Sequence, residues 1–265
     1  MRKGRSRRFR RRLPTLDGRA LVVLVLVLAG CAPEPAPAPT PAGPKPLTAC
    51  LSRPDDTAFA TCVQAELDAA WGREFRDTGR IYTPPRLTVD AAAPSDNSSP
   101  PRDGRGQRTD SDEPDRAYFA PQSGGEIHFP AAYLAAVHAA HGPLAHLVLT
   151  FTMGHEFGHH VQFLLHPRTE VRVNELESQA DCYAGIWARQ EADAGGLDIG
   201  QFRASAAAEL HRLSSYHNEV DTHGGPDQRL ASLDRGLHGD SPASCDQGEL
   251  TWLPRPSNRR HPLSS

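Results

Sequence analysis

The chain has 265 residues, 38% of them hydrophobic, and a formal net charge of −3. Nine of the 29 Lys and Arg residues and one of the 32 acidic residues lie in residues 1–30, so the remainder carries a charge near −11. This excludes a basic patch of the kind that holds nucleic acid. The length allows one well-packed domain of ordinary size.

Residues 1–30 predict the signal peptide of a lipoprotein. Basic side chains in residues 2–12 precede Leu21–Leu28, an apolar run too short to span a bilayer comfortably. The sequence Leu28-Ala-Gly-Cys31 resembles a bacterial lipobox, which implies cleavage before Cys31 and attachment of lipid to that residue. An uncleaved anchor and an ordinary secretory signal are the alternatives. We expect a cell membrane lipoprotein on the extracytoplasmic face, with the membrane as a partner through its lipid anchor.

Residues 31–49 are rich in Pro and Ala and predict a semi-rigid tether. A single domain is expected over residues 50–246. Within it, residues 91–116 are rich in Pro, Asp, Ser and Arg, which predicts a mobile surface loop. Residues 247–265 are expected to form a disordered tail.

Four cysteines follow Cys31, and an even number outside the cell predicts disulfides. Three pairings are possible. We favour Cys50–Cys62, which would fasten the opening segment to the next helix. We also favour Cys182–Cys245, which would join a long helix to the C-terminal end.

The hydrophobic pattern predicts an α+β fold that is predominantly α-helical, with a small sheet. Apolar side chains at a spacing of four predict a helix over residues 55–76. Residues 81–89 predict a strand. Glu126–Phe129 is interpreted as an edge strand that either pairs with an extended substrate or is purely structural. Further helices are predicted over residues 130–141, 145–165, 172–194, 199–217 and 226–238.

The pentapeptide from His155 to His159, His-Glu-Phe-Gly-His, carries the strongest chemical indication in the chain. Histidines at i and i+4 lie on one helix face and can bind one Zn²⁺, while Glu156 can face a water on the ion. The surrounding segment is apolar on most sides, which predicts burial. Without a metal, burial of these polar groups would be costly, which disfavours the alternative of an exposed pair on an ordinary helix.

A catalytic zinc site takes three protein ligands and leaves one position open. The third ligand is not supplied by the metzincin pattern, which continues the motif with a glycine and a third histidine. Gln162 and Leu165 stand at those two positions. On a second helix, Glu177 and Asp181 are spaced i, i+4, which predicts Glu177 as the third ligand. Asp181 would accept the second N–H of a ligating histidine. Glu175 competes for the ligand position but lies about 200° around the helix from Glu177.

The motifs at residues 155–162, 177–187, 222–229 and 240–246 together resemble the putative neutral zinc metallopeptidases of bacteria. The resemblance covers roughly residues 60–246. It implies a zincin-like metallopeptidase domain whose ligands are arranged as in gluzincins.

The resemblance and the local chemistry together imply a zinc-dependent peptidase acting on a peptide or protein substrate. Glu156 would take a proton from the metal-activated water and deliver it to the leaving amine. His223 is the candidate donor to the developing oxyanion, with a capping residue in a turn as the alternative interpretation. Arg229 would serve as that donor instead, or would clamp a carboxylate.

Two alternatives to a peptidase stay open. One is a membrane-tethered binding or scaffold lipoprotein with a non-catalytic zinc site, and the other is an enzyme that cleaves another amide of the cell envelope. A structural zinc site normally has four protein ligands, whereas three are found here beside a glutamate, which favours catalysis.

Overall fold

The computed structural model describes residues 47–90, 116–121, 124–166, 172–215, 223–248 and 250–252. The predicted signal peptide, most of the tether and almost all of the loop 91–116 lie outside these residues.

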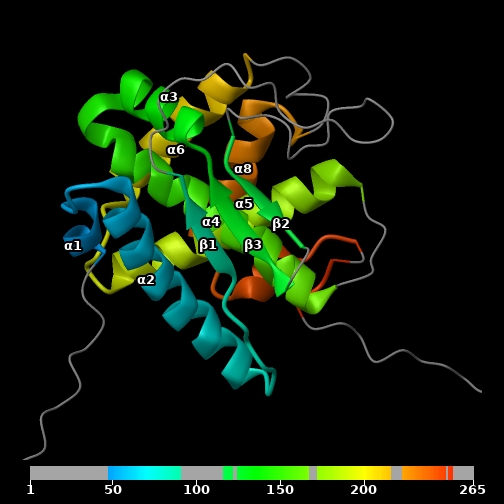
Figure 1. The fold of residues 1–265 in the computed structure, drawn as a ribbon. Coiled ribbons are helices and arrows are strands. Elements are labelled where there is room, and N and C mark those ends of the chain that lie inside the picture. The colour runs from blue at the N-terminus through cyan, green and yellow to red at the C-terminus, as the bar shows by residue number, and fades with distance from the viewer. Residues whose placement is uncertain are drawn as a thin grey trace, which may run out of the picture. The chain divides into compact units, whose positions relative to one another are not determined.

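The fold is α+β and mostly helical, as predicted (Figure 1). The main helices lie within a few residues of their predicted positions. They are α2 (Asp56–Asp77), α3 (Ala131–His141), α4 (Ala145–Leu165), α5 (Val173–Asp193), α6 (Ile199–Leu213) and α8 (Pro226–Leu237). The short helix α1 (Thr48–Leu51) was not predicted. The 3-10 turns η3 (Gly142–Leu144) and η4 (Pro242–Cys245) precede α4 and follow α8. The Asp55 carboxylate accepts a hydrogen bond from the Ala58 amide at 2.7 Å and so fixes the start of α2.

The sheet contains β1 (Arg86–Val89), β2 (Tyr118–Ala120) and β3 (Glu126–Phe129) in the order β1-β3-β2. β3 pairs in parallel with β1 and antiparallel with β2. The prediction that Glu126–Phe129 is an edge strand is therefore wrong. β3 is central, and β2, which was not predicted, forms an edge. A strand of three residues is too short to show a hydrophobic period.

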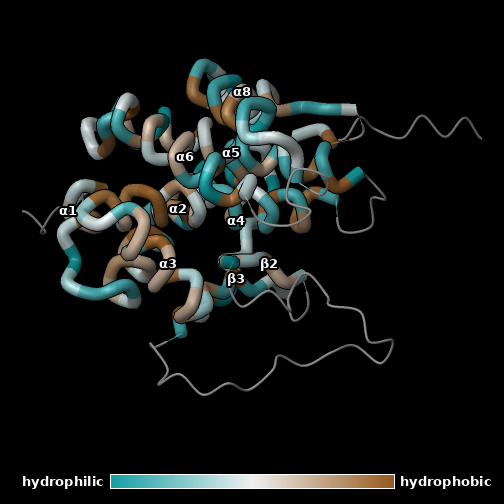
Figure 2. The backbone as a smooth tube through the Cα atoms, turned by 90° about the horizontal axis from the view of Figure 1, so that it is seen from above, coloured by the Kyte–Doolittle hydropathy of each residue, from teal (hydrophilic) through white to brown (hydrophobic). Residues whose placement is uncertain are grey.

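The sheet, α4, α5 and α8 follow one another as successive layers (Figure 2). The stretch Ala131–Leu165 is long and apolar enough to cross a membrane by length and composition. In the fold it is divided between α3, η3 and α4, and α4 is the buried central helix.

Small residues allow α4, α5 and α8 to approach closely, as the small and apolar run Ala180–Trp187 indicates. A Cβ atom added at Gly158 of α4 would lie 2.7 Å from the Cα of Ala180 on α5. A Cβ at Gly236 of α8 would collide with the carbonyl of Cys182. The contact at Gly158 holds the helix that carries the two histidines against the helix that carries Glu177, and the contact at Gly236 holds α8 against that same helix.

Both favoured disulfides, Cys50–Cys62 and Cys182–Cys245, are present. Leu47 is fully buried, so the folded domain includes residues before the predicted boundary at residue 50.

The prediction of a disordered tail from residue 247 is wrong for the first part of that segment. Leu250 and Trp252 are buried, and the Trp252 ring contacts Trp71, Phe75 and Tyr183. These two apolar residues have polar neighbours in sequence, so they form no periodic pattern from which burial could be predicted.

Candidate metal centre

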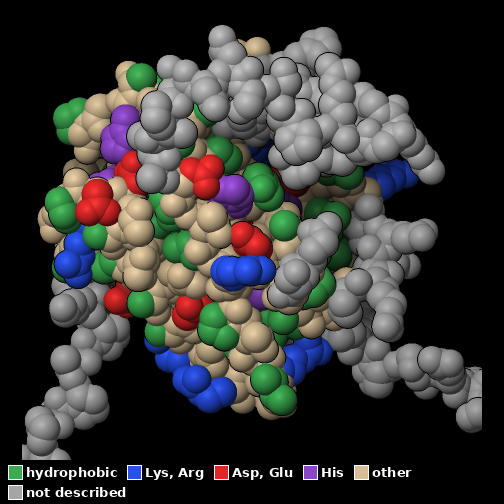
Figure 3. Space-filling model, viewed as in Figure 1, with side chains coloured by type: hydrophobic (Ala, Val, Ile, Leu, Met, Phe, Trp, Pro, Cys, Tyr) green, Lys and Arg blue, Asp and Glu red, His purple; other side chains and the backbone are tan. Residues whose placement is uncertain are grey.

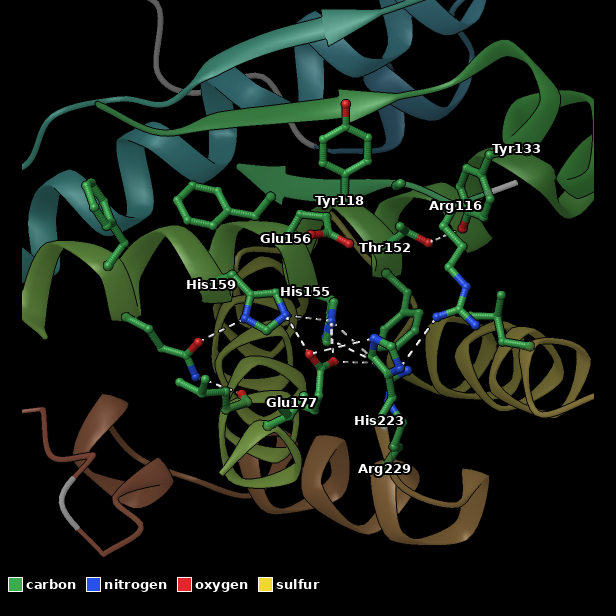
Figure 4. Close-up of a pocket in the computed structure, with 18 of the residues that line it drawn as sticks. Arg116, Tyr118, Tyr133, Thr152, His155, Glu156, His159, Glu177, His223 and Arg229 are labelled. Carbon is green, nitrogen blue, oxygen red and sulfur yellow. Dashed lines mark hydrogen bonds and ion pairs between the residues drawn. The ribbon is translucent and has the colours of Figure 1, made fainter. Parts of the chain in front are cut away.

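Three side chains from α4 and α5 converge in the interior. The Nε2 atoms of His155 and His159 are 3.1 Å apart. Glu177 places Oε2 3.2 Å from His155 Nε2 and Oε1 3.3 Å from His159 Nε2 (Figure 4). The structure thus brings together the three residues predicted as ligands.

These distances fit a zinc ion. Donor atoms about 2.1 Å from a tetrahedral ion lie about 3.4 Å from one another, close to the three separations observed. Within the described part of the chain, Glu177 Oε2 is buried and accepts no hydrogen bond of suitable geometry. A buried carboxylate oxygen of this kind requires a cation or a donor.

The outer nitrogens of the imidazoles are held by two different acceptors. His155 Nδ1 lies 2.8 Å from Asp181 Oδ1, the contact expected of Asp181. His159 Nδ1 lies 2.9 Å from Gln162 Oε1. The Gln162 amide nitrogen donates to the carbonyl of Leu176 at 2.7 Å, so its oxygen must face the imidazole. When a cation is bound and the rings are neutral, Nδ1 therefore carries the proton in each and Nε2 presents a lone pair to the shared centre.

Asp181 is fully buried and is held by Arg229 of α8. The guanidinium donates from Nε to Asp181 Oδ2 at 2.9 Å and from Nη2 to Oδ1 at 2.8 Å. Burial by itself would raise the pKa of Asp181, but the charges of Arg229 and His155 hold this pKa below its usual value. Arg229 therefore clamps a carboxylate, and that carboxylate belongs to the chain itself.

The ionised Asp181 also acts on His155. Burial disfavours a charged imidazole, yet the field of Asp181 outweighs it and raises the pKa of His155 to about 10. The same field makes the imidazole a better electron donor to a cation. Burial likewise opposes the charge of Glu177, but the two imidazoles hold its pKa well below the usual range.

The predicted catalytic residues lie beside this centre. Glu156 is buried and lies on the side of the imidazoles that faces β2, whereas Glu177 lies on the opposite side (Figure 4). His223 Nε2 is 4.0 Å from Glu177 Oε1, and its Nδ1 is 3.5 Å from Arg116 Nη1. The competing Glu175 is outside the ligand group and lies near Gly248.

A model of the family described as "Putative neutral zinc metallopeptidase" matches residues 20–248. The chain belongs to this family. The protein named "Uncharacterized protein YpfJ" of Escherichia coli strain K12 is 26% identical over 224 residues, covering 75% of this chain and 74% of the relative. The protein of the same name from Escherichia coli O6:H1 strain CFT073 matches to the same extent. No solved structure matches the chain.

A cavity of about 360 Å³ opens onto the candidate metal centre of this family member. Glu156, His223 and Arg229 line one part of it. The remaining wall is largely apolar and includes Phe119, Phe151, Phe163, Val173, Leu176 and Leu213. A cavity with a few convergent polar groups in an apolar wall is typical of a substrate site.

Sequence reasoning missed the role of Gln162, which entered only as a reason to exclude the metzincin pattern. Its position three residues after His159, on the same helix face, was the available indication. Gln162 also contacts the side chain of Gln179 at 3.2 Å, and Gln179 donates to the carbonyl of Leu250 at 2.9 Å. This chain of hydrogen bonds links a ligand to the C-terminal segment.

Proposed function

We propose that the protein is a zinc-dependent peptidase that hydrolyses peptide bonds. The observation that carries the proposal is the convergence of His155, His159 and Glu177 on one point beside the buried Glu156, at the inner end of a cavity. A zinc ion held there supplies a Lewis acid that acidifies water and polarises a carbonyl group.

The chain's own residues account for the remaining chemistry. Glu156 takes a proton from the attacking water and later delivers it to the leaving amine. His223 and Arg116, which lie together at the cavity, donate hydrogen bonds to the carbonyl oxygen as negative charge develops on it. A structural zinc site normally has four protein ligands. Three protein donors beside a cavity therefore favour catalysis.

β2 provides a place for an extended substrate. Among the described residues, it pairs with β3 along one side and no strand pairs with its other side. In the close-up, β2 is the strand nearest the candidate ligands (Figure 4). A peptide bound antiparallel or parallel to β2 would use main-chain hydrogen bonds for affinity and the apolar wall of the cavity for selectivity.

The test combines zinc quantification on the full chain with turnover of a broad peptide library. Glu156→Gln should keep its zinc and lose turnover by about 10²–10⁴-fold, because proton transfer is removed while the ligands remain. Glu175→Gln, a change on α5 outside the ligand group, is the control and should keep both zinc and turnover. A zinc-loaded wild type that cleaves no library peptide would overturn the proposal and favour the scaffold alternative.

We further propose that the protein acts on the extracytoplasmic face of the cell membrane, held by lipid on Cys31. The lipobox-like ending of the signal peptide supports this, and the two disulfides favour an oxidising compartment. Cys31→Ser should move the protein from the membrane fraction to the soluble fraction. An unchanged membrane fraction would contradict lipid anchoring.

A further inference from the structure

Away from the candidate active site, three side chains from three helices meet at the surface. Asp56 opens α2, His138 lies in the last turn of α3, and His146 lies in the first turn of α4. Asp56 Oδ1 is 2.8 Å from His138 Nε2 and 3.2 Å from His146 Nε2. Histidine and acidic side chains lie together on the surface near α3 (Figure 3).

We propose that Asp56, His138 and His146 form a second zinc site, separate from the candidate catalytic one. One carboxylate oxygen and two imidazole nitrogens lie close enough to share a single ion. Two imidazoles and a carboxylate are a ligand set that suits zinc, with water completing the tetrahedron. His146 is nine residues before His155 on α4, so the two sites are about 13 Å apart along the helix axis.

The hydrogen bonds of His146 support a metal. Its Nδ1 lies 3.1 Å from the carbonyl oxygen of Leu51, which can only accept, so Nδ1 carries a proton. In a neutral ring, Nε2 would then direct a lone pair at the Asp56 carboxylate, which is repulsive. A cation between the two removes the repulsion, and a second proton on His146 is the competing explanation. Donation of the outer N–H to a backbone carbonyl is also usual for metal-ligating histidines.

The arrangement around His146 is held in place before any ion binds. Its ring stacks on Phe59 with centroids 4.2 Å apart and planes 6° apart. The side chains of His146 and Asp56 are 16% and 23% exposed, whereas that of His138 is 44% exposed. Two ligands are therefore fixed in position and the third closes the site from the solvent side, which makes the ion exchangeable.

An ion here would tie together α2, α3 and α4. Since Leu51 and Phe59 lie within the loop that the Cys50–Cys62 disulfide closes, the site would reinforce the attachment of the N-terminal helices to the core. Zinc bound at this position would stabilise the folded state, because the unfolded chain lacks the preformed group of ligands.

The experiment measures zinc per chain by equilibrium dialysis of the chelator-stripped full-length protein near pH 7.5. We expect about two ions for the wild type, and about one for both His138→Ala and the double variant His155→Ala/His159→Ala. Combining all three changes should leave about none. His211→Ala, a change of an exposed histidine on α6, is the matched control and should keep about two ions.

A second measurement uses Co²⁺ in the His155→Ala/His159→Ala variant, where the proposed new site remains alone. The absorption band of tetrahedral Co²⁺ should appear when the ion is added, and binding of the ion should raise the melting temperature. Both effects should be lost when Asp56→Asn is added to this variant. About one zinc ion in the wild type and none in the double variant would overturn the proposal and favour a doubly protonated His146. Neither measurement uses peptide turnover. A failure of the peptidase proposal, seen as absent turnover, is therefore distinguishable from a failure of the second zinc site.

Discussion

At the scale of single residues, Gln162 has the same relation to His159 as Asp181 has to His155. Each accepts the outer N–H of one imidazole and so directs its other nitrogen toward the candidate zinc position. Asp181 is charged and Gln162 is neutral, so the two imidazoles differ in electron donation even though their geometry is alike.

Replacing Gln162 by Met should weaken zinc binding by about 10–100-fold, because the side chain keeps its length and loses the acceptor for His159. Gln162→Glu keeps an acceptor oxygen at that position and should lose less affinity. The measurement is competition for zinc against a chromophoric chelator. Equal affinities for Gln162→Met and the wild type would contradict a role for this contact.

Asp68 provides a pH-dependent contribution to stability. Burial raises the pKa of Asp68 to about 6, although Tyr82 donates a hydrogen bond to it at 2.7 Å. An unfolded aspartate titrates near 3.9, so between about pH 4 and pH 6 the folded state binds more protons than the unfolded state. The free energy of unfolding should therefore fall as the pH rises through this window, by on the order of 1 kcal/mol after allowing for solvent access.

Asp68→Asn should flatten this slope, as measured by urea unfolding at several pH values. Asp77→Asn, at an exposed position of the same helix, should leave the slope unchanged. A slope that persists in Asp68→Asn would assign the effect to another group.

At the scale of the elements, the close contact of α4 with α5 sets the distance between the ligands. Gly158→Ala should cost about 1–3 kcal/mol in the free energy of unfolding, because the new methyl would meet the backbone of Ala180 at 2.7 Å. The same variant should also bind zinc more weakly, because Glu177 moves away from the imidazoles.

Gly72→Ala on α2 is the matched control for this change. Its added Cβ would lie 3.6 Å from the Arg76 side chain, an ordinary contact. Helix propensity should then stabilise the protein by up to about 1 kcal/mol. Denaturant unfolding gives the free energy of unfolding of both variants. If Gly158→Ala is as stable as Gly72→Ala, the contact between α4 and α5 can relax.

The elements also show how far sequence reasoning extends. The ligands of α4 were predictable because i, i+4 spacing within one helix fixes their relative direction. Glu177 was predictable from its own i, i+4 relation to Asp181. The contact of Arg229 with Asp181 and the central place of β3 depend on tertiary packing, which no local period records.

At the scale of the whole molecule, the two disulfides close loops of very different length. Cys182–Cys245 spans 63 residues of sequence and Cys50–Cys62 spans 12. In the chain-entropy description, the longer loop restricts the unfolded state more, by about 1.5 kcal/mol for this difference in length.

The variant Cys182→Ala/Cys245→Ala should therefore lose about 2–4 kcal/mol of unfolding free energy, and Cys50→Ala/Cys62→Ala should lose less. Guanidinium unfolding of the two variants gives the comparison. A larger loss for the shorter loop would mean that local packing, rather than loop closure, dominates.

The glycines at the helix crossings have a consequence for folding order. Each glycine inside a helix lowers intrinsic helix propensity by about 1 kcal/mol relative to alanine, and α4, α5 and α8 all contain at least one at a contact. Peptides excised from these helices should have little stable secondary structure in water. The group formed by the two imidazoles and the carboxylate is therefore expected to form late in folding, when the three helices pack together. Metal binding should then indicate that folding is complete.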